Sequence, residues 1–206
     1  MSKIRIHQGD LPDLALYQNG AVAIDTETLG LKPHRDRLCV VQLSNGDGTA
    51  DLIQIAKGQK EAPHLQRLLQ DKKLTKIFHF GRFDLAILMC HFGEVAGPIF
   101  CTKIASRLVR TYSDRHGLKE ICSELLQVQL SKQQQSSDWG AMKLSPAQQE
   151  YAAADVLYLH RLKDVLQGRL EREDRLDIAQ ACFDFLPIRA RLDLLGWEEA
   201  DIFAHS

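Results

Sequence analysis

The sequence predicts a single α/β domain, and two features support this. Short runs of alternating or β-branched apolar residues occupy the first 79 residues, and longer runs with helical spacing occupy the rest. With 206 residues, 45% of them hydrophobic and 26% charged, the chain is long enough to bury a core without disulfides. We see no repeat, linker or domain boundary within residues 1–206, and an apolar C-terminal tail covers about residues 183–206.

Five strands are expected in the first 79 residues, because apolar residues alternate there and β-branched residues are frequent. The first three follow one another too closely for helical crossovers, so they should form an antiparallel meander. The expected ranges are 3–7, 20–26, 38–43, 49–54 and 75–79.

Helices are expected in the remainder of the chain. Residues 81–93 have apolar residues at helical spacing, and Gly93 should end that helix. Two further helices fit 102–110 and 117–126. After a polar stretch, Ser145-Pro146 should begin the longest helix, from about 146 to beyond 165.

Cysteine usage indicates a cytoplasmic protein, and the charge distribution fits either a polyanionic ligand or a solvated surface with no partner. The five cysteines are scattered without a CxxC pair, which is typical of reduced, buried thiols. No signal peptide is evident at the N-terminus, and no run approaches the roughly 18 apolar residues of a membrane span. Residues 1–163 carry 21 Lys and Arg against 17 Asp and Glu, whereas residues 164–206 carry 5 against 10. The basic excess of the larger part suits a polyanion.

Two carboxylates follow a strand that should be buried, in the segment AVAIDTETLG, residues 21–30. Side chains alternate across a strand, so Asp25 and Glu27 project from the same face. Two carboxylates held that close resist ionisation unless a positive charge lies between them, and a divalent cation with oxygen ligands would supply it. The alternative is that these residues only open a turn, so further carboxylates are needed to favour a metal.

Two more acids lie where they can complete such a site. Asp84 should open the helix after the fifth strand, where a helix N-terminus by itself favours an acid. Tyr151 and Asp155 are four residues apart in YAAADVLYLH, so they share one helix face, which three alanines leave uncluttered. Taken alone, this pair is better explained by an ordinary amphipathic helix. The four acids and the tyrosine in this order are far more specific.

The combination resembles the DEDD 3′–5′ exonucleases, in the subclass with tyrosine in the last motif. Residues 118–162 resemble the ribonuclease D branch, in which a K-x-x-Q-x-S-x-W pattern, here Lys132, Gln135, Ser137 and Trp139, precedes the YAAxD helix. Length and motifs are most similar to the small alphaproteobacterial enzymes called nano-RNase C. The resemblance implies a ribonuclease H-like exonuclease fold, a mixed five-stranded sheet with helices on both faces.

The resemblance also implies metal-dependent hydrolysis that releases 5′-mononucleotides from the 3′ end of RNA. Four carboxylates can balance two divalent cations, and oxygen-only ligation favours Mg²⁺ or Mn²⁺ over zinc. By resemblance, Asp25 bridges both ions, and Glu27 and Asp155 hold the ion that carries the nucleophilic water. Asp84 would bind mainly through water. Tyr151 should orient the nucleophilic water, because a usual pKa of about 10 makes tyrosine a poor base.

Candidate substrate-binding residues are less specific. Thr28 and Leu31 match positions that contact the terminal nucleotide in related exonucleases, with Leu31 as an apolar wedge or else as plain packing. His79 and Arg82 flank the Asp84 motif and could meet phosphate or ribose, although His79 could equally be a satisfied histidine at a strand end. Lys132 and Gln135 come from the ribonuclease D pattern.

A basic stripe lies between residues 103 and 119, and it is either phosphate-facing or a solvated helix face. Its members are Lys103, Arg107, Arg110, Arg115 and Lys119.

Two departures from the ribonuclease D pattern bear on the function. Cys101 precedes Thr102 where those relatives usually have aspartate, and the accessory C-terminal domain of the larger enzymes has no counterpart here. We therefore expect a 3′–5′ exoribonuclease for very short RNA. The alternatives are a general exonuclease for longer RNA or DNA, and a catalytically silent nucleic-acid-binding protein. The apolar tail predicts a homo-oligomer, and the resemblance suggests a ring-like multimer.

Overall fold

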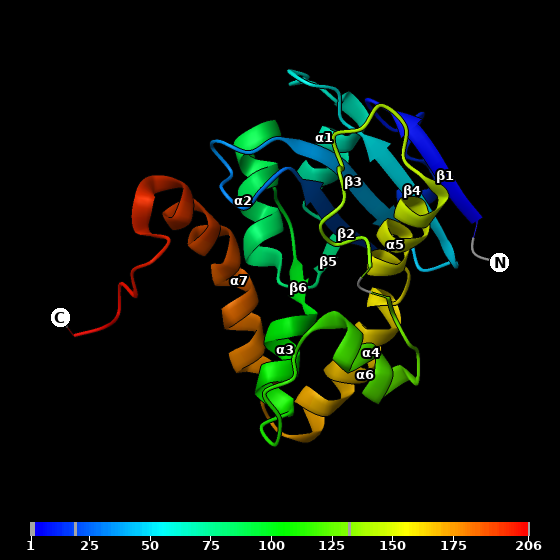
Figure 1. The fold of residues 1–206 in the computed structure, drawn as a ribbon. Coiled ribbons are helices and arrows are strands. Elements are labelled where there is room, and N and C mark those ends of the chain that lie inside the picture. Colours follow the sequence, from blue (N-terminus) through cyan, green and yellow to red (C-terminus); the bar gives the residue numbers. More distant parts are fainter. Residues whose placement is uncertain (1–2, 19, 132, 206) are drawn as a thin grey trace.

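The computed structural model describes residues 3–18, 20–131 and 133–205, and it contains a mixed sheet with helices packed on both of its faces (Figure 1). The order across the sheet is β1-β4-β3-β2-β5-β6. The α/β class expected from the sequence is confirmed. The strands are β1 (Lys3–Gln8), β2 (Ala21–Thr28), β3 (Leu38–Ser44), β4 (Thr49–Gln54), β5 (Thr75–Phe78) and β6 (Ile99–Cys101).

The sheet differs from expectation in strand number and pairing. The antiparallel meander is β2-β3-β4, whereas β1 pairs in parallel with β4 at the edge. β1 thus pairs with a strand that is not the next one along the chain. The segment between β1 and β2 contains the short helical turn Ala15–Tyr17. A sixth strand, β6, adds in parallel to β5. Its three residues are too few to show alternation, so only pairing with β5 reveals it.

The expected helices fall close to their predicted positions, with one exception, and two further helices, over Pro63–Gln70 and Leu176–Leu192, were not predicted. The run expected from 146 to beyond 165 is two helices that meet at Tyr158. α5 packs on β2, β3 and β4, whereas α6 packs mainly on α3 and α4, so different partners set the two directions. The helices are α1 (Pro63–Gln70), α2 (Gly81–Phe92), α3 (Thr102–Val109), α4 (Leu118–Leu126), α5 (Pro146–Leu157), α6 (Leu159–Arg172) and α7 (Leu176–Leu192).

The first part of the apolar C-terminal tail packs on the chain itself. α7 lies against α2, α3 and β6 and buries Phe183 and Leu186. Ile188 of α7 is itself exposed, and the segment that leaves α7 toward the C-terminus (Figure 1) carries four further exposed large apolar side chains. These are Leu195, Trp197, Ile202 and Phe203. The apolar content of the tail therefore serves the core in part, through the face of α7 that packs on α2, α3 and β6.

The edge strand β1 is fastened to β4 by a buried carboxylate. Asp51 is 2% exposed and accepts hydrogen bonds from Arg5 Nε at 2.6 Å and Tyr17 Oη at 2.5 Å, and it contacts His7 Nε2 at 2.7 Å. Burial would raise the pKa of Asp51, but the hydrogen bonds from Arg5, Tyr17 and His7 outweigh it and lower the pKa. The carboxylate thus stays charged and joins β1, β4 and the Tyr17 turn.

All five cysteines are free thiols, as the sequence suggested. Within the described residues, no helix combines the length and the apolar character that crossing a membrane requires.

Candidate active site

The carboxylates of Asp25 and Glu27 lie near the end of β2. This strand is held on both sides, by β3 and by β5. Residues 22–24 of the strand, just before Asp25, are fully buried, which anchors the strand in the core. Along β2 the two acids alternate with Thr26, so they project from one face of the sheet and Thr26 from the other.

Asp84 enters from α2, which follows the neighbouring parallel strand β5. The chain turns sharply between them: Phe80 has a left-handed φ of 67°, and a Cβ on Gly81 would lie 2.9 Å from the Cβ of Phe78. Only glycine therefore lets α2 start this close to β5. Asp84 is 3% exposed and accepts a hydrogen bond of 2.7 Å from Thr26 Oγ1. This bond places Asp84 beside β2. The position agrees with the pairing of β2 and β5, because the carboxyl ends of two parallel strands lie at the same edge of the sheet.

Asp155 and Tyr151 come from one face of α5. The helix begins with a capping box, in which Ser145 Oγ accepts from Gln148 N and Gln148 Oε1 accepts from Ser145 N. The Tyr151 ring packs on the buried indole of Trp139, with ring centroids 5.9 Å apart. The small Ala152 and Ala153 are buried, so α5 can approach the sheet closely.

Three of the four acids converge. The carboxylates of Asp25, Glu27 and Asp155 each offer an oxygen within 4.8 Å of the others, the one such group of three among the described residues. No ion pair between described residues involves any of the four acids. Gln42 Nε2 approaches Asp25 only at 3.4 Å. An oxygen-only donor set without basic partners fits a hard divalent cation.

The electrostatics of the four acids agree with that donor set. Burial, then repulsion from Asp84, Asp155 and Glu27, raises the pKa of Asp25 well above its usual value. Burial and repulsion raise the pKa of Glu27 to about 9 and that of Asp155 to about 7. Burial raises the pKa of Asp84 to about 7, although the bond from Thr26 opposes it. Without a cation, the cluster is therefore partly protonated at neutral pH.

The tyrosine beside this cluster holds its proton. Burial, and then the charge of Asp155, raises the pKa of Tyr151 above its usual value. The hydroxyl therefore keeps its proton at neutral pH and is available as a hydrogen-bond donor.

A cavity of about 320 Å³ opens over the cluster. Two lysines, Lys103 and Lys119, line it together with the acids, so cations and carboxylates face the same space. Gln135 also lines the cavity, from the polar segment that the sequence analysis singled out. His79 lines it too, and its Nδ1 shares a 2.9 Å hydrogen bond with Thr102 Oγ1. Burial, then the nearby Lys103, lowers the pKa of His79 to about 3, so the ring is neutral.

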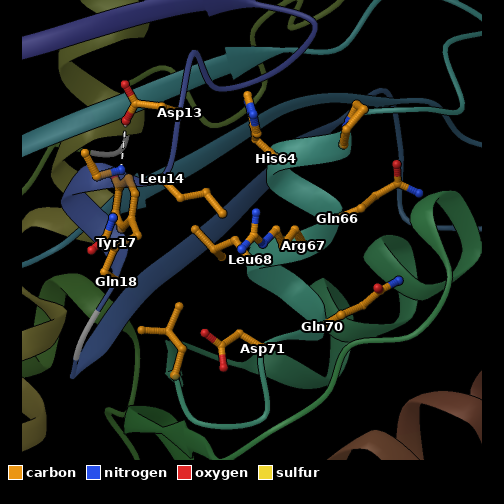
Figure 2. A pocket seen from close by; sticks show the side chains of 13 residues that line it. Asp13, Leu14, Tyr17, Gln18, His64, Gln66, Arg67, Leu68, Gln70 and Asp71 are labelled. Atoms are coloured by element: carbon orange, nitrogen blue, oxygen red, sulfur yellow. Dashed lines mark hydrogen bonds between the residues drawn. The ribbon is translucent and has the colours of Figure 1, made fainter.

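A larger cavity of about 1010 Å³ lies elsewhere, between residues 13–18 and α1 (Figure 2). Its lining mixes apolar side chains with amides and single charges, such as Arg67 and Asp71. It contains none of the four acids, so the size of a cavity does not locate the reactive groups here.

Other predicted binding residues lie outside the cavity lining. Thr28 donates to the Gly30 carbonyl, and Leu31, 77% exposed, stands on the loop after β2. Arg82 pairs with the C-terminal segment: its Nε and Nη2 donate to Asp193 at 2.6 and 2.8 Å. The expectation that Arg82 meets substrate is therefore not supported, because its guanidinium is already engaged. Lys132 lies outside the described residues.

The basic stripe divides in the structure. Lys103 and Lys119 face the cavity, whereas Arg107 and Arg115 are exposed. Arg110 was wrongly included, because its side chain is buried and ion-paired with Glu124.

Two residues of the site were missed in the sequence. Thr26 donates a hydrogen bond to Asp84. Its position between Asp25 and Glu27 could have indicated this contact, because alternation along β2 turns its side chain to the other face of the sheet. Phe80 lines the cavity and has a left-handed backbone φ, which no local sequence pattern predicts for phenylalanine.

A family model described as a 3′–5′ exonuclease matches residues 13–171. The chain belongs to this family. The exonuclease domain is of the ribonuclease D type: it is 39% identical to ribonuclease D of Acidiphilium cryptum over 156 residues, which is 76% of this chain and 39% of that protein. The chain thus spans about two fifths of the length of the curated relatives it matches.

Solved structures match the exonuclease domain over more of their length. A structure of Brucella melitensis NrnC bound to pGG is 69% identical, covers 100% of both chains and has a TM-score of 0.97. The same protein with bound Mg²⁺ is 69% identical over 99% of this chain and 100% of that chain, with a TM-score of 0.95. Escherichia coli RNase D is 29% identical over 86% of this chain and 46% of that chain, with a TM-score of 0.77. The ribonuclease H-like exonuclease fold and the resemblance to nano-RNase C are confirmed.

Proposed function

We propose that the protein is a metal-dependent 3′–5′ exoribonuclease that releases 5′-mononucleotides from very short RNA, with diribonucleotides as the best substrates. The observation that carries this proposal is the group of Asp25, Glu27 and Asp155, whose oxygens lie within 4.8 Å of one another beside a cavity of about 320 Å³. The similarity to NrnC, which has been solved with pGG, supports a short substrate.

In this proposal Asp25, Glu27 and Asp155 hold two Mg²⁺ or Mn²⁺ ions. Bound cations would polarise the phosphodiester and stabilise the charge of an in-line displacement. Asp84 is fixed by Thr26 and contributes through water, since it stands outside the group of three. Tyr151 orients the attacking water with its protonated hydroxyl, and Trp139 fixes the ring that carries it.

The substrate is held by residues around the cavity. Lys103 and Lys119 are placed to meet phosphate oxygens, and Gln135 can offer an amide to the same strand. The neutral ring of His79 suits a ribose hydroxyl better than a phosphate. Leu31, exposed beside the end of β2, would separate the last two bases, while Thr28 supports the turn in front of it.

Substrate length is the decisive measurement. A pocket that grips both ends of a dinucleotide should disfavour longer RNA, whose continuing strand would displace those contacts. We expect kcat/KM to be highest for 5′-phosphorylated diribonucleotides and to fall for four- and seven-nucleotide RNAs. The salt dependence should be shallow, because few phosphates are engaged.

The same series separates the alternatives. Values that are equal or rise with length would favour a general 3′–5′ exonuclease, and matched DNA oligomers would show whether the 2′-OH is read. Binding of RNA without cleavage in Mg²⁺ or Mn²⁺ would favour a catalytically silent nucleic-acid-binding protein.

We also propose that the protein is a homo-oligomer. Leu195, Trp197, Ile202 and Phe203 remain exposed after α7 has packed on the core, and such apolar side chains commonly form interfaces. A closed, ring-like assembly would cover them in every copy. Light scattering at micromolar concentration should give a multiple of 23.3 kDa, and a monomer would refute this.

The free thiols suit a reducing compartment, and we propose the cytoplasm. Fractionation of the native cells would test this.

A further inference from the structure

The segment after α7 is fastened to the start of α2, next to the proposed metal ligand Asp84. α7 ends at Leu192, and residues 193–197 form one further helical turn. Within this turn Gly196 has a positive φ of 101°, which departs from helical geometry. Arg82 of α2 donates two hydrogen bonds to the Asp193 carboxylate, at 2.6 and 2.8 Å. Its Nη2 also donates to the Glu198 carbonyl at 2.7 Å. Because both oxygens of Asp193 are engaged, the geometry is fixed as well as attractive.

A second arginine completes this contact from α7 itself. Arg189 donates to Asp193 Oδ1, with Nη2 at 2.5 Å, and to the carbonyls of Trp197 and Ala200. Asp193 is therefore shared by two guanidinium groups, and its side chain is only 12% exposed. A partly buried ion pair with two parallel hydrogen bonds is stronger than an ordinary exposed ion pair on the surface.

The same segment also holds the loop that joins β2 to β3. His34 Nε2 lies 2.8 Å from the Leu194 carbonyl, and Lys32 forms an ion pair with Glu198. From the other side, Cys90 of α2 contacts the Pro33 carbonyl at 3.3 Å. Residues 30–37 are thus held between α2 and the C-terminal segment, which lies on the same side of the molecule (Figure 1).

That loop begins two residues after Thr28 and carries the exposed Leu31. It has internal hydrogen bonds, from Lys32 N to Asp36 Oδ2 at 2.9 Å and from Asp36 N to the Lys32 carbonyl at 2.8 Å. These bonds fix the shape of the loop but not its position relative to the acids of β2. The position depends on contacts outside the loop, and residues 194 and 198 supply two of them.

We propose that the C-terminal segment 193–198 is a positioning element for substrate binding, with Asp193 as its central residue. Arg82 anchors this segment to α2, and the segment in turn sets where Leu31 stands relative to the acids of β2. This inference rests on the proposed function, since it assumes that Leu31 meets the terminal nucleotide. It gives Arg82 a role through Asp193 in place of the substrate contact that the sequence suggested.

The first test measures the loop without any substrate. Hydrogen exchange followed by mass spectrometry should show faster exchange of residues 29–37 in Asp193→Ala, with β2 and β3 unchanged. Asp184→Ala is the matched control, because Asp184 is also on α7, is exposed and accepts a hydrogen bond from Gln180 of the same helix. Glu198→Gln, which neutralises the carboxylate that pairs with Lys32 but leaves Asp193 in place, should give a smaller change in the same peptides.

The second test measures kinetics, on whichever RNA of the length series the wild type cleaves fastest. Asp193→Ala should raise KM about 10-fold with little change in kcat, because a displaced loop weakens binding while the acids stay in place. Asp193→Glu, which keeps the carboxylate, should recover part of that loss. Asp184→Ala should behave as wild type, and light scattering should show the same assembly for all variants.

Several results would overturn the inference. Unchanged exchange in residues 29–37 would show that the segment does not hold the loop. Faster exchange with an unchanged KM would show that the loop position does not matter for binding. An inactive wild type would refute the proposed function, and the exchange experiment would still decide whether the segment positions the loop.

Discussion

Asp51 on β4 and Asp25 on β2 belong to the same sheet, but their surroundings shift the pKa of the carboxyl group in opposite directions. Asp51 receives hydrogen bonds from Arg5 and Tyr17, which lower its pKa and keep it charged. Asp25 faces three further carboxylates, and burial with that repulsion raises its pKa. The carboxylate of Asp51 is neutralised by a cation of the chain itself and joins two strands. The carboxylate of Asp25 has no such partner among the described residues, so a cation from outside the chain would be needed to neutralise it.

Removing an acid from the unmatched group should have the largest effect. Asp25→Ala, or Asp155→Ala, should leave less than about a tenth of the wild-type rate, because a metal ligand is lost. The metal-free protein should unfold at the same or a higher temperature, since repulsion is relieved. Asp164→Ala, on the exposed face of α6, is the control. Turnover above a tenth in either variant would contradict the metal assignment.

Tyr151→Phe should reduce kcat by roughly 10²- to 10⁴-fold, because an oriented hydroxyl beside the acids is removed. Mg²⁺ binding, measured by calorimetry, should barely change. Tyr112→Phe, whose hydroxyl bonds Glu124 on the surface, should keep the wild-type rate. Wild-type kcat in Tyr151→Phe would mean that the tyrosine only packs on Trp139.

Asp51→Asn should have the opposite profile to the variants of the cluster. The free energy of unfolding should fall by about 2–3 kcal/mol, since hydrogen bonds to a charged group are lost and Arg5 keeps an unmatched charge. kcat per folded molecule should not change. Chemical denaturation gives the first quantity, and an activity loss without destabilisation would show that Asp51 also serves the site.

The smallest expected effect is on the pH dependence of stability. The folded-state pKa values of Glu27, Asp84 and Asp155 are raised, so the folded chain holds protons that the unfolded chain has lost. Metal-free stability should therefore decline as pH rises from about 4 to about 9. The Asp51 contribution runs the other way and is lost only in acid.

Thermal unfolding tests this sign. Between pH 6 and pH 8 the metal-free protein should lose at least about 1 kcal/mol, which is a few degrees in Tm. Saturating Mg²⁺ should remove most of this decline, because cations take the place of protons. A Tm that rises with pH in the absence of metal would contradict the raised pKa values.

Much of the fold and of the site was predictable because it depends on local rules. Alternation located β2, helical spacing located α2 and α5, and a capping sequence marked the start of α5 at Ser145. The spacing of Asp25 and Glu27 determined that they share a face, and that of Tyr151 and Asp155 did the same on α5.

Only the tertiary structure decided how these pieces meet. The pairing of β1 with β4, the short β6 and the break at Tyr158 depend on partners far away in sequence, which local periodicity does not record. Arg82 is the clearest case. Beside Asp84 in sequence it looks like a substrate ligand, but a helix directs neighbouring residues to different sides. Its guanidinium meets Asp193, 111 residues away, because α7 packs against α2.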